Sequence, residues 1–317
     1  MKNIASIEIG SNSIRMLIAE KPDSGNDFRE VYRKRVITKI GEDFNSNQIE
    51  TLKRVPIERS VSALGEFFDI AKKFGVTYPF AVATGVIRKA VNGNDFISLV
   101  SKKFGGNVRI ISGEEEAGLT CKGVLFSLNY SDGPFLIFDL GGGSTEFVLV
   151  RNGEKEIMSL NLGAVVLTQD YLSDDPPSKG QINRLINYIE GIFNLNLCNF
   201  NEIENECFTL IGTGGSAYTL AKIIKEMKKK DFVEKDKSVT SLKKTEIEGV
   251  FEKIRAVPAL ERLNFKGIEK GREDTILAGT AMVIKIMDYF NKNEIVVSYS
   301  DILEGILIKY GGGEKNE

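Results

Sequence analysis

Two kinds of hydrophobic pattern alternate along this 317-residue chain. Short apolar runs bounded by turn residues predict strands, and apolar residues recurring every three or four positions predict helices. Strands are expected at 3–9, 14–20, 28–40, 78–83, 108–111, 135–138, 147–150, 156–162, 208–211 and 295–297. Helices are expected at 57–74, 95–104, 112–126, 163–171, 182–193, from 217 onward, at 275–290 and at 301–310. This mixture predicts an α/β protein.

The stretch 135–150 carries the strongest chemical signal. A fully apolar strand ends at Asp139, three glycines follow, and Ser144-Thr145-Glu146 leads into a returning strand. Glycines at 141–143 allow a phosphate to approach successive backbone N–H groups, with no Cβ in the way. A carboxylate on either side suits a divalent cation that bridges phosphate oxygens. A plain tight turn is the alternative explanation of a lone glycine run.

The same arrangement occurs earlier in the chain. Residues 7–15 align with residues 138–146: a buried strand ends in acid-apolar-Gly, passes a turn of small residues and continues as a second strand. The two copies are about one domain length apart, so we expect two related α/β domains with one phosphate-binding hairpin each. Two such hairpins facing each other would hold an oligophosphate from both sides.

The composition of the chain excludes several kinds of binding partner and catalytic site. The formal charge is −2 with acidic and basic residues interspersed, which gives no electrostatic case for nucleic acid or an anionic membrane. The cysteines lack Cys-x-x-Cys spacing and are expected to be reduced thiols of a cytoplasmic protein. No apolar run approaches the ~18 residues of a membrane span, and the N-terminus runs straight into a strand with no signal peptide. The chain contains no histidine, which excludes a Ser-His-Asp triad, a histidine metal site and a phosphohistidine.

Proton transfer therefore falls to another residue type, and the run Glu114-Glu115-Glu116 is the best candidate. Ser112 is a good N-cap, and Glu115, three residues on, would complete a capping box. Glu114 complements the helix dipole in the first turn. Glu116 has no such structural task and precedes two small residues, so it is the candidate base, against the alternative of a plain surface glutamate.

Two further junctions could bind phosphate. Arg88 follows a strand and a Thr-Gly turn and could neutralise phosphate oxygens, although an ordinary surface arginine would look the same. Residues 212–216, Gly-Thr-Gly-Gly-Ser, lie between a strand and a helix and could bind phosphates or a nucleoside. A packing turn explains the second junction nearly as well.

These motifs together resemble the exopolyphosphatase and guanosine-pentaphosphate phosphohydrolase (Ppx/GppA) family, part of the superfamily of actin, sugar kinases and heat-shock ATPases. The resemblance spans nearly the whole chain. Its specific part is the pairing of a Ser-Gly-x-Glu-Glu-Ala block with Gly-Gly-Gly-Ser-Thr-Glu. The motifs that carry it are Glu8-Ile9-Gly10-Ser11-Asn12-Ser13, Thr84-Gly85-Val86-Ile87-Arg88, Ile111-Ser112-Gly113-Glu114-Glu115-Glu116-Ala117, Asp139-Leu140-Gly141-Gly142-Gly143-Ser144-Thr145-Glu146, Gly212-Thr213-Gly214-Gly215-Ser216 and Arg272-Glu273-Asp274.

The resemblance implies two actin-like, ribonuclease-H-type domains flanking a phosphate-binding cleft. The first would hold residues 1–122 and the second residues 123–300. The final helix, within 301–317, would pack back on the first domain, as in the family.

It also implies a Mg²⁺-dependent hydrolase that removes terminal phosphate from polyphosphate or from guanosine pentaphosphate, with guanosine tetraphosphate as a further ligand. Glu116 would be the base and Arg88 a catalytic cation, while Asp139, Glu146 and Glu8 would surround the metal. The phosphate-binding residues would be Ser11, Asn12, Gly141, Gly142, Gly143, Ser144, Thr145, Gly214, Gly215, Ser216 and Arg272.

The chain departs from the family pattern at two positions. Glu8 stands where the family usually has Asp, and Leu303 stands where it usually has Arg. Longer relatives add a histidine-containing helical module, which this chain lacks, so short polyphosphate or guanosine pentaphosphate is the expected substrate. A non-catalytic guanosine tetra- or pentaphosphate sensor and an ATP-dependent small-molecule phosphotransferase remain alternatives, and a homodimer is a possible assembly.

Overall fold

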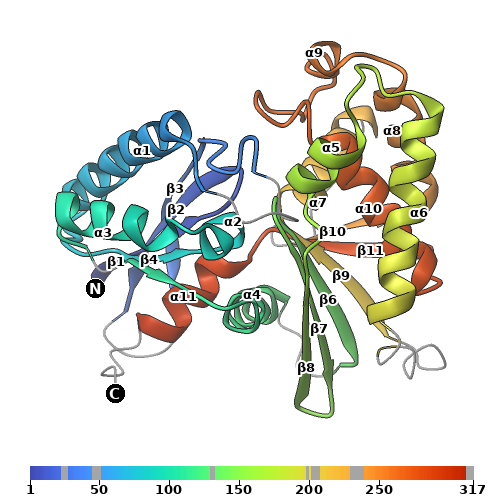
Figure 1. Cartoon of the computed structure of the whole chain (residues 1–317). Coiled ribbons are helices and arrows are strands. Elements are labelled where there is room, and N and C mark those ends of the chain that lie inside the picture. Colours follow the sequence, from blue (N-terminus) through green and yellow to red (C-terminus); the bar gives the residue numbers. More distant parts are fainter. Residues whose placement is uncertain are drawn as a thin grey trace. The chain divides into compact units, whose positions relative to one another are not determined.

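The computed structural model describes residues 1–22, 28–44, 51–106, 108–128, 133–197, 200, 208–228 and 239–311. The chain forms two compact units (Figure 1). Unit 1 contains Met1–Phe126 and the residues from Ser300 onward, and unit 2 contains Ser127–Tyr299. The boundary after Phe126 leaves nearly all of helix α4, Gly113–Leu128, with unit 1.

Unit 1 is built on a five-stranded sheet with the order β3-β2-β1-β4-β5. Its first three strands are an antiparallel meander, whereas β4 and β5 run parallel to β1. The strands are β1 Lys2–Ile9, β2 Ser13–Lys21, β3 Arg29–Ile37, β4 Phe80–Ala83 and β5 Val108–Ile110. The other helices of this unit are α1 Arg54–Lys73, α2 Gly85–Lys89, α3 Gly93–Phe104 and α11 Ile302–Tyr310.

Both faces of this sheet are covered, because successive strand side chains point to opposite sides. Met16 and Ile18 of β2 belong to the core under α1 and α3, whereas Leu17 and Ala19 pack with Leu303 and Leu307. Helix α11 contacts β1, β2 and β4. The last helix of the chain therefore completes the core of the first unit.

Unit 2 has a six-stranded sheet with the order β10-β11-β9-β6-β7-β8. Its strands are β6 Phe135–Leu140, β7 Thr145–Arg151, β8 Glu154–Leu160, β9 Thr209–Thr213, β10 Val239–Lys243 and β11 Glu294–Ser298. Its helices are α5 Ala164–Tyr171, α6 Lys179–Asn196, α7 Gly215–Lys228, α8 Lys244–Arg255, α9 Ala259–Arg262 and α10 Ile276–Tyr289.

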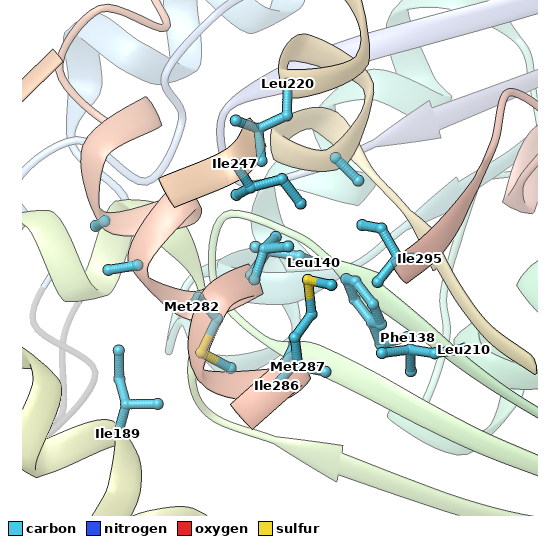
Figure 2. Close-up of a cluster of buried hydrophobic side chains, with 14 of the residues drawn as sticks. Phe138, Leu140, Ile189, Leu210, Leu220, Ile247, Met282, Ile286, Met287 and Ile295 are labelled. Atoms are coloured by element: carbon cyan, nitrogen blue, oxygen red, sulfur yellow. The ribbon is translucent and has the colours of Figure 1, made fainter. Parts of the chain in front are cut away.

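The core of unit 2 gathers around α10, whose buried side chains meet strands β6, β9 and β11 and helices α6, α7 and α8 (Figure 2). Phe138 on β6 is fully buried, as are Met282 and Met287 on α10. Removing each such side chain from water stabilises the fold by about 1.5–3 kcal/mol. This core holds the glycine-rich end of β6 in place.

The two sheets share one design. In unit 2, β6, β7 and β8 form an antiparallel meander and β9 lies parallel to β6, as β4 lies parallel to β1 in unit 1. The hairpin registers also match, because Glu8 lies opposite Arg15 and Asp139 lies opposite Glu146. The predicted fold class, two ribonuclease-H-type α/β units, is confirmed, and the aligned segments are structural repeats.

Several elements differ from the sequence-based expectations. Strand β3 ends at Ile37 rather than Ile40, because Lys39 adopts a left-handed conformation with φ 47°. Helix α2, strand β10 and helices α8 and α9 were not predicted. Helix α8 nevertheless carries the expected spacing, since Ile247, Val250, Phe251 and Ile254 are its buried residues.

Some expectations fall on residues outside the described ranges. These are the expectations of reduced thiols at Cys198 and Cys207. Cys121 is a buried free thiol. Within the described part of the chain, no helix is both long and apolar enough to cross a membrane.

Helices α4 and α11 approach each other through two glycines. A Cβ on Gly123 would lie 1.8 Å from the Asp301 carbonyl oxygen, and a Cβ on Gly305 would lie 1.8 Å from the Leu119 carbonyl oxygen. Such distances are far inside van der Waals contact, so the helices can pack this closely only where both residues lack a side chain. This contact fixes where α11 begins.

We expect Gly123→Ala to lower the free energy of unfolding by about 2–3 kcal/mol, because the new methyl group forces α4 away from α11. Urea denaturation followed by circular dichroism measures this loss. Gly118→Ala on the same helix is the matched control, because no described atom lies within 4 Å of its Cβ position. There the gain in helix propensity of up to about 1 kcal/mol should stabilise the protein. Equal effects of the two variants would contradict the assignment.

Candidate active site

Each unit contains one tight turn closed by the same hydrogen bond. In unit 1 the Gly10 N–H donates to the Ser13 carbonyl at 3.0 Å, and in unit 2 the Gly141 N–H donates to the Ser144 carbonyl at 3.0 Å. These four residues occupy equivalent places in the aligned segments 7–15 and 138–146. The backbone thus repeats the hairpin turn in detail, although the side chains differ.

In unit 2, the first N–H groups of helix α5 hold the carbonyls of this turn. Ala164 donates to the Gly141 carbonyl at 3.0 Å and Val165 to the Gly142 carbonyl at 2.9 Å. Because a trans peptide places its N–H opposite its C=O, the N–H groups of Gly142 and Gly143 point away from α5. Two successive N–H groups on one side of a glycine turn form a nest suited to a phosphate.

Unit 1 holds its turn in the same manner. The Ser11 carbonyl accepts from the Gly41 N–H at 2.9 Å, and the Asn12 carbonyl accepts from the N–H groups of Thr38 and Lys39 at 3.1 and 2.9 Å. The Asn12 N–H is therefore directed away from residue 41. The segment after β3 thus holds the turn carbonyls in unit 1, as the start of α5 holds them in unit 2.

Ser11 and Asn12 add side-chain donors to the first turn. The Ser11 hydroxyl oxygen accepts from the Val86 N–H at 3.0 Å, which leaves its own O–H available to donate. The Asn12 side chain is 8% exposed, and its Nδ2 is buried with no hydrogen-bond partner among the described residues. A buried amide donor without a partner is costly, and an anion at the turn would satisfy it.

Buried Glu116 and partly buried Arg88 form an ion pair in unit 1. Arg88 Nη1 donates to Glu116 Oε2 at 2.7 Å and to the Ile111 carbonyl at 3.0 Å. Burial raises the pKa of the Glu116 carboxyl above its ordinary value of 4.5, Arg88 opposes this rise and Glu8 adds to it. The structure thus brings together the predicted base and the predicted catalytic cation.

Glu8 lies close to this pair but is itself engaged. Its Oε2 accepts from Arg15 Nε at 2.6 Å, and its Oε1 lies 3.4 Å from the Thr84 hydroxyl. A Cβ on Gly10 would be 2.8 Å from Glu8 Oε1, so the carboxylate is folded back against the turn. A carboxylate paired with a guanidinium is a poor direct ligand for Mg²⁺, and the expected metal role of Glu8 does not suit this geometry.

Asp139 and Glu146 are the remaining candidates for a cation. They lie opposite each other on β6 and β7, both buried, and Ser159 donates to Glu146 Oε1 at 2.8 Å. In the part of the chain that the structure describes, no group of three Asp, Glu, Cys or His side chains could hold a metal ion. Mg²⁺ commonly takes one or two carboxylates and fills its other positions with phosphate oxygens and water, and this pair fits that mode.

A second anion-binding arrangement lies at the start of α7. Gly214 has φ 89°, and a Cβ there would lie 2.6 Å from Asp139 Oδ1, so only glycine fits. The Arg272 guanidinium lies directly over Gly215, because a Cβ on that residue would be 2.1 Å from its Nη1. A helix N-terminus beside a buried arginine attracts anions. Ser216 is turned elsewhere, because its hydroxyl lies where a Cβ on Gly279 of α10 would stand, 2.1 Å away.

The other predicted residues are placed as follows. The Ser144 carbonyl closes the second turn, and the Thr145 hydroxyl donates to the Leu162 carbonyl.

Ser112 caps α4 as expected, since its hydroxyl accepts from the Glu115 N–H at 3.0 Å. The expected capping box is wrong in its second half. The Glu115 carboxylate accepts from Lys309 Nζ at 3.0 Å and from the Tyr310 hydroxyl at 2.8 Å instead, because α11 offers it stronger partners.

Sequence analysis overlooked Gly163 and Gly85. A Cβ on Gly163 would lie 2.2 Å from the Gly142 carbonyl oxygen, so glycine is required where α5 meets the turn. Gly85 has φ 52°, and a Cβ there would lie 2.3 Å from Ser11 Oγ. Gly163 was the first residue of the predicted helix 163–171 and Gly85 lay in the Thr-Gly turn after a predicted strand, but neither glycine was assigned a role of its own.

The Ppx/GppA phosphatase family matches residues 17–311, and the chain belongs to this family of hydrolases. It is 32% identical over 321 residues to a bifunctional 3-dehydroquinate synthase/phosphatase of Fusobacterium nucleatum, covering 96% of this chain and 46% of that relative. The chain thus spans about half of that relative's length. It is 26% identical to exopolyphosphatase 2 of Mycobacterium tuberculosis, with 98% of this chain and 99% of the relative covered.

A solved structure, the PPX-GPPA enzyme of Aquifex aeolicus, has the same fold. It superimposes with a TM-score of 0.76 at 29% sequence identity and covers 97% of this chain and 99% of that one.

We expect Gly215→Ala to weaken binding of inorganic triphosphate about tenfold, because the added methyl group displaces the Arg272 guanidinium and one charge-assisted hydrogen bond is lost. The free energy of unfolding should change by less than about 1 kcal/mol, since the displaced atoms end a flexible side chain. Isothermal titration calorimetry and urea denaturation measure the two quantities. Gly191→Ala on α6, where no described atom lies within 4 Å of the Cβ position, is the control. If the affinity of the Gly215 variant for triphosphate is unchanged, Arg272 does not contribute to phosphate binding.

Proposed function

We propose that this protein is a Mg²⁺-dependent phosphoanhydride hydrolase that removes terminal phosphate from polyphosphate or guanosine pentaphosphate. The observation that carries the proposal is the ion pair between buried Glu116 and partly buried Arg88, in the same unit as the Ser11–Asn12 turn. A base with a raised pKa beside an anion-binding turn is what hydrolysis by an activated water requires.

The proposed roles of the individual residues are as follows. The N–H groups of the Gly142 and Asn12 peptides and the Asn12 amide bind phosphate oxygens, and Arg272 binds a further phosphate. Arg88 neutralises charge on the phosphoryl group and keeps Glu116 in its anionic form. Glu116 takes a proton from the attacking water. Phosphoryl transfer depends mostly on positioning and charge neutralisation, so no covalent step on the protein is needed.

Asp139 and Glu146 are the residues proposed to hold Mg²⁺. When bound, the ion would supply positive charge to the phosphate oxygens. Glu8 is assigned no direct bond to the metal, because Arg15 occupies its carboxylate.

Short chains are the proposed substrates. The described residues offer two phosphate-binding turns and Arg272, and many other cations are paired with acidic neighbours, for example Arg29 with Glu20 and Lys34 with Glu66. A long polyanion needs an extended run of unpaired positive charge.

The deciding experiment measures phosphate release from short polyphosphate, long polyphosphate, guanosine pentaphosphate and ATP in separate assays with Mg²⁺. Release from the first or third substrate supports the proposal. Processive hydrolysis of long polyphosphate at a higher kcat/KM would contradict the proposed preference for short chains. If the protein binds guanosine tetraphosphate tightly but releases phosphate from none of the substrates, it is a sensor. If it transfers phosphate from ATP to a small acceptor, it is a phosphotransferase.

We expect Glu116→Gln to lower kcat by about 10²–10⁴-fold, because the amide cannot accept the proton of the attacking water. The dissociation constant for substrate should stay within about threefold, since the shape is unchanged. Glu115→Gln is the neighbouring control. It loses charge opposite Lys309 and should cost about 0.5–1 kcal/mol of stability while turnover continues. If the Glu115 variant is inactive and the Glu116 variant is active, the assignment of the base to Glu116 is wrong.

The pH profile gives an independent test of the ion pair. A base with a raised pKa loses activity as the pH falls through that pKa, so the acidic limb of kcat/KM should lie above pH 4.5. Arg88 holds the pKa of Glu116 down, so Arg88→Gln should move this limb to higher pH, whereas Arg88→Lys keeps the charge and should move it less. A limb that stays in place in Arg88→Gln would show that another group titrates.

A further inference from the structure

One arginine connects the end of β1 to the start of α11. Arg15 Nε donates to Glu8 Oε2 at 2.6 Å, and Arg15 Nη1 donates to Asp301 Oδ2. All three side chains belong to unit 1, and Glu8 and Asp301 are 8% and 5% exposed. A buried, charge-assisted chain of this kind fixes the orientation of each member.

Asp301 has two separable tasks. Its Oδ1 accepts from the Leu303 N–H at 3.1 Å and so caps α11, while Oδ2 faces Arg15. The close backbone contact with Gly123 holds residue 301 in place, so the carboxylate is a rigid anchor for the arginine. Burial alone would raise the pKa of the Asp301 carboxyl, but Arg15 and Arg33 lower it, so the anchor stays charged.

We propose that Asp301 is a positioning residue for the active-site carboxylate Glu8 and acts on it through Arg15. The inference rests on the proposed function, because it concerns the surroundings of the base. Glu8 Oε1 lies 3.4 Å from the Thr84 hydroxyl, which is also within reach of Glu116, so the two carboxylates compete for its single proton. The place of Glu8 therefore determines the hydrogen bond and the field that the base experiences.

The length of Glu8 explains why such an anchor is needed. Glutamate has one more rotatable bond than aspartate, so its carboxylate can occupy more positions at the same backbone site. Arg15, held from behind by Asp301, selects the position in which Oε1 folds against Gly10 and approaches Thr84. Without the charge at 301, the guanidinium loses its second anchor and Glu8 regains its freedom.

A second ion pair, between Arg33 of β3 and Glu304 of α11, provides the comparison. Glu304, one turn after Asp301, is 4% exposed and pairs with Arg33, and its Oε2 accepts from the Asp301 N–H at 2.9 Å. Arg33 has another partner in Glu30, at 2.8 Å. This pair stabilises the same helix and carries similar charge, but among the described residues Arg33 bonds to Glu30 and Glu304 and not to Glu8.

The test is Asp301→Asn, assayed with full-length protein on short polyphosphate. Asparagine is also a good N-cap, so α11 keeps its cap while Arg15 loses the charge at position 301 and keeps Glu8 as its charged partner. We expect kcat to fall about tenfold, the loss that one weakened charge-assisted hydrogen bond produces, with KM within about twofold. An unchanged or increased kcat would overturn the proposal.

Glu304→Gln is the matched control, because Gln still serves at the third position of a capping box while the charge opposite Arg33 is lost. It should lower Tm as much as Asp301→Asn or more and leave kcat within about twofold of wild type. Equal losses of kcat in the two variants would show that Asp301 merely stabilises α11.

A double-mutant cycle with Arg15→Gln decides whether the effect passes through Arg15. Asp301→Asn should have no further effect on kcat in the Arg15→Gln background, whereas additive losses would exclude this route. If Arg15→Gln does not fold, the contrast between the Asp301 and Glu304 variants still decides. A wild-type protein that hydrolyses none of the substrates would refute the proposed function itself, whereas an active wild type with an equally active Asp301 variant would refute only this inference.

Discussion

The planarity of the peptide bond is the constraint on which this site depends. Each hairpin turn has its carbonyls held by a neighbouring segment, residues 38–41 in unit 1 and the first turn of α5 in unit 2. Because a trans peptide carries its N–H on the opposite side, holding the carbonyls also directs the donors. The direction of these donors is thus determined by backbone hydrogen bonds, and the two turns present the same donors although their two central residues differ.

Buried charge is the second determinant, and the acidic groups in unit 1 are not all treated alike. Glu116 faces a single arginine and keeps a raised pKa, whereas arginines hold Asp301 in its charged form. Unpaired burial of a carboxylate is strongly unfavourable, so the number of cationic partners determines which carboxyls keep a raised pKa. Glu116 and Glu304 each pair with one arginine and keep a raised pKa, whereas two arginines lower the pKa of Asp301.

Much of the fold could be predicted from sequence because the strand signals are local. Apolar runs with clear ends, such as 135–138, gave the meanders, and the aligned segments 7–15 and 138–146 gave the repeat. Helix α8 was overlooked although its apolar spacing was present, and strand β10 lies beside β11 only through long-range pairing. Contacts between residues hundreds of positions apart leave no local trace.

The candidate site, like the fold, could be predicted from sequence only where the signals are local. Glu116, Arg88 and the glycine turns could be identified from residue type and spacing. The partner of Glu115 could not, since Lys309 gains its role only when α11 returns to the first sheet. Arg15 faces Glu8 across the β1–β2 hairpin, but its second partner, Asp301, also comes from the distant start of α11. The predicted capping box failed for that reason: a lysine and a tyrosine distant in sequence compete better for Glu115 than the local N–H does.

The return of α11 also has a consequence for biosynthesis. Unit 2 is continuous in sequence, from Ser127 to Tyr299, whereas unit 1 needs both ends of the chain. A ribosome produces the strands of the first sheet before unit 2, but Leu17 and Ala19 acquire their partners Leu303 and Leu307 only after unit 2 has been synthesised. Domains usually fold in the order in which they emerge. In this protein the N-terminal unit must keep one apolar face uncovered until the other unit has been translated, so the part that emerges first is the last to mature.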